Sequence, residues 1–259
     1  MKITSVNNDI IKHISKLQQR KYRDESGLFL LEGEKAVEEA IEYGINIRYL
    51  FVEEDSELFM HSDRIETTQA VLSKISTTVT PPKVVGVGEQ ITRNWSDEYK
   101  RVVLLEDIKD AGNLGTIIRT SCAFGVDAII LYGDTVDLYN PKCVRASVGN
   151  LWKVPIFDIK TLDELHRMTR NLTPISTLPK NNNSVWLSDF IPPESFVMMF
   201  GTESSGLSDD LIEYTKEKGQ FLTIEMTDKV ESLNLSISTG VILYKLWQLY
   251  TSYHKIRLR

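Results

Sequence analysis

Polar side chains follow three apolar segments in the second half of the chain, and chemistry is expected among them. The apolar segments are VVLLED, FVMMF and FLTIEM. The polar residues, in chain order, are Asn113, Arg119, Glu203, Ser232 and Asn234. In open α/β sheets, ligands bind at the carboxyl ends of the strands. If the apolar segments are parallel strands, these amide, hydroxyl and charged groups can bind and orient one ligand.

Each segment also has a simpler interpretation. Asn113 can cap a helix, Arg119 can lie on the surface of that helix, and Glu203 can accept backbone N–H bonds near a helix start. The Ser- and Asn-rich run at 232–238 also suits a helix start. The glycines after VVLLED do not form the GxGxxG pattern of a dinucleotide site. The four histidines are far apart in the sequence, so no metal site is predicted.

Strands alternating with helices are expected on both sides of a polar linker at 89–100. Before the linker, LFLLEG, IRYLFV and KVVGVG indicate strands, and helices are expected at 10–22, 34–43 and 71–76. After it, buried strands that do not alternate in polarity indicate a parallel sheet covered on both faces. Helices are expected near 116–124 and over 235–253. We therefore predict an α/β protein with a smaller domain at 1–95 and a larger one at 96–259.

The charge balance argues against general affinity for phosphate. Lys and Arg number 30 against 36 Asp and Glu, giving a net charge of -6 in a chain of 259 residues. Phosphate contact needs a local patch rather than a basic average, and one such patch is present. It comprises five basic residues in or just after the expected helix at 10–22: Lys12, Lys16, Arg20, Lys21 and Arg23. On its own, this run can equally be a solvated helix face.

Several features predict a cytoplasmic protein without a membrane segment. Cys122 and Cys143 are too few for a disulfide framework and lack metal-ligand spacing, so both are expected to be reduced thiols. The N-terminal stretch carries charges throughout, unlike a signal peptide. No apolar run reaches the length of a membrane span.

Together, NLGTIIRTSCAFG, FGTESSGLS and SLNLSIS resemble the three ordered motifs of the SpoU (TrmH) family of RNA ribose 2'-O-methyltransferases, in the SPOUT superfamily. The resemblance covers 101–253. The first domain resembles the family's N-terminal substrate-binding domain, a ribosomal-protein-like α/β module. Two departures occur: Ala111-Gly112 follows Asp110 where the family often has Pro-x, and Glu225 stands where it often has proline. Because proline fixes φ, both departures alter loop stiffness more than chemistry.

The resemblance implies a C-terminal α/β-knot domain with a deep trefoil knot and S-adenosylmethionine as the methyl donor. It further implies a homodimer that acts on RNA. The two-domain organisation is more similar to that of the rRNA-directed members than to that of the tRNA-directed ones. By motif position, the expected cofactor-binding residues are Thr177, Leu178, Gly201, Ile224 and Leu233. The expected catalytic residues are Asn113, Arg119, Glu203, Ser232 and Asn234. The basic patch near the N-terminus and the tail with Lys255, Arg257 and Arg259 become the expected RNA contacts.

Arg119 is the residue expected to act on the 2'-hydroxyl. A guanidinium with a pKa above about 12 is a poor base. We therefore expect Arg119 to hold a phosphate or the developing alkoxide electrostatically, with Asn113, Glu203 and Asn234 fixing its orientation. Two other functions remain open: methylation of tRNA by the same fold, and an inactive RNA-binding or ribosome-assembly factor.

Overall fold

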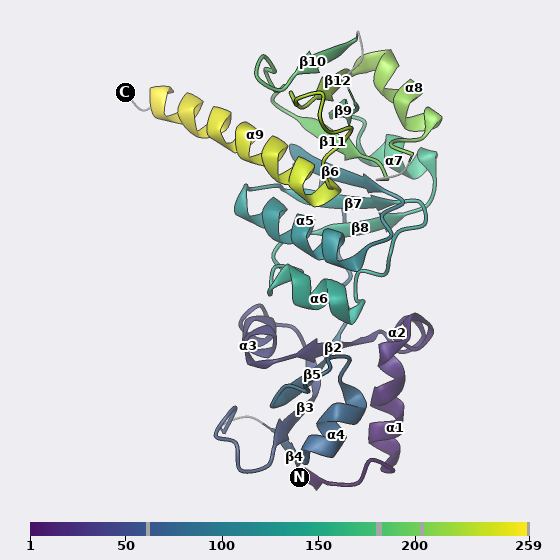
Figure 1. Cartoon of the computed structure of the whole chain (residues 1–259), viewed down its shortest axis with the longest axis vertical. Coiled ribbons are helices and arrows are strands. Elements are labelled where there is room, and N and C mark those ends of the chain that lie inside the picture. The colour runs from purple at the N-terminus through teal and green to yellow at the C-terminus, as the bar shows by residue number, and fades with distance from the viewer. Residues whose placement is uncertain (61–62, 180–182, 203–204, 258–259) are drawn as a thin grey trace. The chain divides into compact units, whose positions relative to one another are not determined.

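The computed structural model describes residues 1–60, 63–179, 183–202 and 205–257 (Figure 1). The chain forms two compact units. Unit 1 comprises Met1–Thr92 and Asp137–Lys153, and unit 2 comprises Arg93–Val136 and Val154–Arg259. The chain therefore passes between the units three times, at 92/93, 136/137 and 153/154. The segment at 137–153, which the sequence alone assigned to the second domain, packs within unit 1.

Unit 1 is built on a mixed sheet with the strand order β1-β4-β3-β5-β2. Its strands are β1 (Lys2–Ile3), β2 (Leu28–Glu32), β3 (Ile47–Glu53), β4 (Ile65–Thr67) and β5 (Val84–Glu89). Its helices are α1 (Asp9–Ser15), the 3-10 turn η1 (Lys16–Gln18), α2 (Arg20–Ser26), α3 (Glu34–Glu42), α4 (Gln69–Ile75) and α6 (Pro141–Ser147). β5 runs antiparallel to both of its neighbours. The three strands predicted before the linker are confirmed as β2, β3 and β5.

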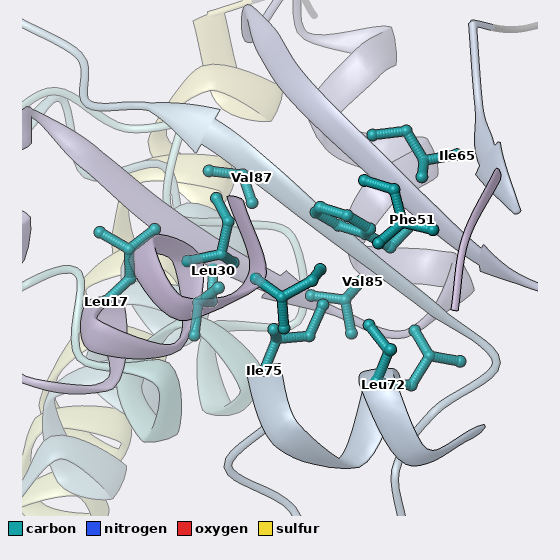
Figure 2. Packing of buried hydrophobic residues seen from close by; sticks show 12 residues of the cluster. Leu17, Leu30, Phe51, Ile65, Leu72, Ile75, Val85 and Val87 are labelled. Atoms are coloured by element: carbon teal, nitrogen blue, oxygen red, sulfur yellow. The ribbon is translucent and has the colours of Figure 1, made fainter. Parts of the chain in front are cut away.

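One core of unit 1 lies between the sheet and helices α1 and α4. Figure 2 shows Leu17, Leu30, Phe51, Leu72 and Val85 gathered there, and all five side chains are buried. Because side chains alternate across a strand, the neighbour of Leu30 faces the opposite side of the sheet. The Phe29 ring lies 4.7 Å from the ring of Tyr139 and 6.3 Å from that of Trp152, measured between centroids. The 137–153 segment thus supplies a second core.

The single helix predicted at 10–22 is wrong. Gln19 has an extended backbone (φ -104, ψ 138) that separates η1 from α2. This break turns α2 so that Arg23 points inward, where its side chain is 2% exposed. Its Nη1 donates to the Leu17 carbonyl at 2.6 Å, and its Nε donates to Asp137 Oδ2 at 2.6 Å. A buried ion pair therefore ties α2 to the 137–153 segment.

Unit 2 contains a seven-stranded parallel sheet with the order β10-β12-β9-β11-β6-β7-β8, so the predicted parallel sheet is confirmed. The strands are β6 (Arg101–Glu106), β7 (Ala128–Tyr132), β8 (Ile156–Ile159), β9 (Thr173–Thr177), β10 (Ser184–Trp186), β11 (Phe196–Phe200) and β12 (Gln220–Thr223). The helices are α5 (Ala111–Ala123), α7 (Leu162–Met168), α8 (Asp209–Lys218) and α9 (Leu235–Arg257).

Helices cover both faces of this sheet. One face packs Val102, Leu104 and Val197 against Leu165 of α7 and Leu211 of α8. The alternate strand residues face the other way, where α5 and α9 lie side by side (Figure 1). In the part of the chain that the structure describes, no helix is long and apolar enough to cross a membrane.

We expect Arg23→Ala to destabilise unit 1 by about 3–5 kcal/mol, because it leaves the Asp137 carboxylate buried without its partner. Urea unfolding followed by tryptophan fluorescence measures the loss. Arg20→Ala is the matched control: Arg20 pairs with Asp24 at 3.5 Å on the surface, where such pairs contribute less than about 1 kcal/mol. Equal unfolding midpoints for the two variants would contradict the structural role of Arg23.

Candidate active site

A cavity of about 390 Å³ lies in unit 2 at the carboxyl ends of β9, β11 and β12. Parallel registers align these ends: Thr177 pairs with Leu222, and Ser176 pairs with Met199. The strands therefore deliver three loops to one edge of the sheet. All five residues expected at the cofactor line the cavity: Thr177, Leu178, Gly201, Ile224 and Leu233. Ser232, from the expected catalytic set, lines it as well.

The loop after β11 closes on itself at the cavity wall. Thr202 and Gly206 exchange two backbone hydrogen bonds of 3.0 Å. A Cβ added at Gly201 would lie 2.1 Å from the Gly206 carbonyl carbon and 2.3 Å from the Leu207 nitrogen. Gly206 has a φ of +72, a left-handed conformation that glycine adopts readily. The two glycines of FGTESSGLS are therefore required by the shape of this loop.

A buried carboxylate that the sequence reasoning missed holds the far end of this loop. Glu106, at the end of β6, is 4% exposed, and its Oε2 accepts the Ser208 N–H at 2.8 Å. Ser208 precedes α8, so Glu106 fixes the start of that helix beside the cavity loop. The available signal was a charged residue closing an otherwise apolar strand, VVLLE.

Two of the expected catalytic residues meet each other. Asn234 Nδ2 donates to Asn113 Oδ1 at 3.2 Å. Asn234 Oδ1 in turn accepts the N–H of Ser236 at 2.9 Å and caps α9. Asn113 lies within the first turn of α5, which begins at Ala111 rather than near Thr116 as predicted. The amide pair therefore joins the first turn of α5 to the start of α9.

Arg119 lies on α5 with an exposed side chain. Among the residues that the structure describes, no hydrogen bond or ion pair involves its guanidinium. The expectation that Asn113 and Asn234 orient Arg119 is therefore not met by a direct contact, since the two asparagines bond to each other. Glu203, the third residue expected to orient it, lies outside the described residues.

Negative charge gathers at the carboxyl ends of β6 and β7. Burial raises the pKa of Tyr132, and the charges of Glu106, Asp210 and Asp107 raise it further. Tyr132 therefore stays neutral at physiological pH. Within the described ranges, no three His, Cys, Asp or Glu side chains gather as ligands for a metal ion.

The basic patch of unit 1 is smaller than the sequence suggested. Lys16 Nζ and Lys21 Nζ lie 5.3 and 5.8 Å from the centroid of the Tyr22 ring. Lys12 and Arg20 are also exposed, and acidic neighbours pair with Lys12, Arg20 and Lys21. Arg23 is removed from the expected RNA contacts because its guanidinium is buried against Asp137. The side chains of Lys255, Arg257 and Arg259 lie outside the described part of the chain.

Comparisons with known proteins agree with this geometry. The model of the SpoU rRNA Methylase family matches residues 100–244, and that of the MRM3-like substrate binding domain matches residues 8–86. These matches and the parallel sheet with its cavity define an α/β methyltransferase joined to a substrate-binding module. The chain belongs to the SpoU rRNA methylase family.

Relatives share nearly the whole length of the chain. An uncharacterised tRNA/rRNA methyltransferase of Synechocystis is 33% identical, covering 94% of this chain and 92% of that protein. The 23S rRNA (guanosine(2553)-2'-O)-methyltransferase of Bacillus subtilis is 27% identical, covering 94% and 98%. An AdoMet-bound rRNA methyltransferase from Sinorhizobium meliloti has a TM-score of 0.82 at 32% identity, covering 95% and 96%. The similarity therefore includes both units.

We expect Gly201→Ala to destabilise the protein by about 1–3 kcal/mol, because the new methyl group overlaps the backbone at Gly206. Thermal unfolding measures the effect. Gly240→Ala is the control, since its Cβ would lie 3.8 Å from Thr120 Cγ2 and alanine favours the interior of α9. A Gly201→Ala variant that melts at or above the parent temperature would show that the loop has room for a side chain.

Proposed function

We propose that this protein is an S-adenosylmethionine-dependent methyltransferase that methylates a ribose 2'-hydroxyl of rRNA. The main support is the cavity at the carboxyl ends of β9, β11 and β12. Its wall includes all five residues that motif position assigns to the cofactor. The name of the Bacillus subtilis relative supports the reaction and the substrate. The Sinorhizobium meliloti structure with bound AdoMet supports the cofactor.

The residues of the cavity fit a methyl donor that carries a sulfonium cation. Its volume of about 390 Å³ lies within the range of small-molecule sites. Apolar side chains such as Leu178, Leu222 and Ile242 dominate the wall. The described lining contains no Lys or Arg, so no side-chain cation repels the donor there. When bound, S-adenosylmethionine supplies an activated methyl group, and the protein must align the acceptor with it.

The chain's own residues then perform two tasks. The Asn113–Asn234 hydrogen bond joins the starts of α5 and α9, which keeps Ser232 and Leu233 in the cavity wall. Arg119 offers an exposed guanidinium that can hold an RNA phosphate or the alkoxide that develops at the 2'-oxygen. Positioning of this kind contributes up to about 7–11 kcal/mol in well-oriented systems.

The finer fold assignment is also a proposal: unit 2 forms a deep trefoil knot. In its support, the chain leaves β12, which lies between β10 and β9, and continues through 224–234. It ends in α9, which packs beside α5, the helix that follows the more distant strand β6. Connections that thread loops are rare, so strand order alone does not establish a knot. The family resemblance supplies the remaining argument.

We propose that unit 1 selects the RNA and that the protein acts in the cytoplasm as a homodimer. The exposed cations of the patch, Lys12, Lys16, Arg20 and Lys21, support the first role. Large apolar side chains are exposed along α9 and support dimerisation: Ile237 at 55%, Val241 at 40%, Tyr244 at 47% and Trp247 at 41%. Such a contiguous patch commonly marks an interface between proteins.

We expect Arg119→Ala to lower the rate of methyl transfer at least about 100-fold, because the variant has no cation to stabilise the transition state electrostatically. Affinity for S-adenosylhomocysteine should stay within about two-fold, since Arg119 does not line the cavity. Labelled-methyl transfer and calorimetry measure the two quantities separately. The transfer rate of Arg119→Lys should lie between those of the parent and Arg119→Ala, because lysine keeps the positive charge but lacks the planar guanidinium with its paired donors.

Arg167→Ala is the matched control for Arg119, since Arg167 is exposed on α7 of the same unit. Its transfer rate should equal that of the parent. Methyl transfer by Arg119→Ala at the parent rate would remove Arg119 from the mechanism. A parent chain that binds RNA but neither transfers methyl nor binds S-adenosylhomocysteine would instead favour the inactive assembly factor.

We expect the double variant Lys16→Ala/Lys21→Ala to weaken rRNA binding and to flatten its salt dependence. The logarithmic slope should fall by about 0.7–0.9 for each phosphate that the variant no longer neutralises. Filter binding at several salt concentrations measures the slope. Lys216→Ala, which removes an exposed cation from α8, should leave it unchanged. An unaltered slope in the double variant would locate the RNA-binding surface elsewhere.

A further inference from the structure

The cavity wall contains a long segment that is anchored at very few points. Residues 224–233 run from the end of β12 to the start of α9, and five of them line the cavity. These are Ile224, Met226, Glu231, Ser232 and Leu233. Up to Thr223, the chain is held on both sides: Leu187 N donates to the Thr223 carbonyl at 2.9 Å, and Thr223 Oγ1 donates to the Leu178 carbonyl at 2.9 Å.

Beyond Thr223, one hydrogen bond joins this segment to another part of the described chain. The Ser188 N–H donates to Glu225 Oε1 at 2.8 Å. Ser188 directly follows Leu187, whose N–H bonds the Thr223 carbonyl, so the Glu225 carboxylate bonds the chain just beyond the end of β10. The Glu225 side chain therefore bonds the chain after β10 at the point where the backbone hydrogen bonds of β12 end.

Glu225 lies between two residues of the cavity wall without lining the cavity itself. Ile224 and Met226 line it, whereas Glu225 reaches away from it toward Ser188. Burial acts to raise the pKa of Glu225, but the Ser188 hydrogen bonds and the charge of Lys245 outweigh it, so the pKa lies below its ordinary value. The carboxylate is therefore ionised at neutral pH, and ionised acceptors form the stronger hydrogen bonds.

We propose that Glu225 is a positioning residue for the methyl donor: by anchoring the 224–233 segment to Ser188, it holds Ile224 and Met226 in the cavity wall. This inference rests on the proposed function of the cavity. It also assigns a role to Glu225 at the position where the family often has proline. A side-chain hydrogen bond restrains the loop here, where a proline would restrain φ.

The test compares Glu225→Ala with Glu225→Gln, whose amide oxygen can still accept the Ser188 N–H. Calorimetry with S-adenosylmethionine and S-adenosylhomocysteine should show about five-fold weaker binding for Glu225→Ala, the loss expected of one net hydrogen bond. Glu225→Gln should bind within about two-fold of the parent. With saturating donor, kcat should be unchanged for both variants, so the defect appears in KM for the donor.

Hydrogen exchange supplies a readout of the hydrogen bond itself. Exchange at the Ser188 amide should accelerate in Glu225→Ala and stay near the parent rate in Glu225→Gln. Glu217→Ala is the matched control, because Glu217 is an exposed carboxylate on α8 in the same unit. It should change neither donor binding nor Ser188 exchange.

Three results would overturn the inference. Donor affinity or Ser188 exchange in Glu225→Ala equal to the parent would show that the Glu225–Ser188 bond does not hold the wall. Equal weakening in the Ala and Gln variants would assign the effect to charge alone. If the parent chain binds neither S-adenosylmethionine nor S-adenosylhomocysteine, the proposed function is wrong and this inference fails with it. If the parent binds them and Glu225→Ala binds them equally well, this inference alone is wrong.

Discussion

Parallel pairing in unit 2 is the constraint on which the site depends. Because β9, β11, β12 and β6 all run in the same direction, their carboxyl ends lie along one edge of the sheet. Segments far apart in the sequence therefore meet there. The Glu106–Ser208 bond and the Asn113–Asn234 bond follow from that arrangement. Each of these two hydrogen bonds holds one segment at this edge of the sheet against another.

In the proposed function, unit 2 carries out the chemistry and unit 1 recognises the RNA. The cavity that we propose for the donor in unit 2 is largely apolar, and its described lining contains no Lys or Arg, which suits a sulfonium cation. Unit 1 carries exposed lysines around Tyr22. The net charge of -6 is compatible with RNA binding because phosphate is held by local cations rather than by the average charge. If the patch contacts RNA as proposed, we expect a modest affinity that depends on the target, because the patch is small.

The sequence predicted well what local pattern determines. The apolar runs became the central strands, and motif positions identified five residues that share one cavity. It failed where distant residues decide the outcome. Nothing near Gln19 shows that the helix must break so that Arg23 can meet Asp137, 114 residues away. Likewise, the placement of 137–153 in unit 1 depends on Phe29 packing with Tyr139 and Trp152, which periodicity does not encode.

The most direct test of the account identifies the methylated nucleoside. Ribosomal RNA from cells lacking this gene is incubated with the protein and S-adenosylmethionine that carries a labelled methyl group, then digested to nucleosides. The account predicts that the label appears in one 2'-O-methylated nucleoside of rRNA and depends on Arg119. Label on a base, or label accepted by tRNA and not by rRNA, would contradict it.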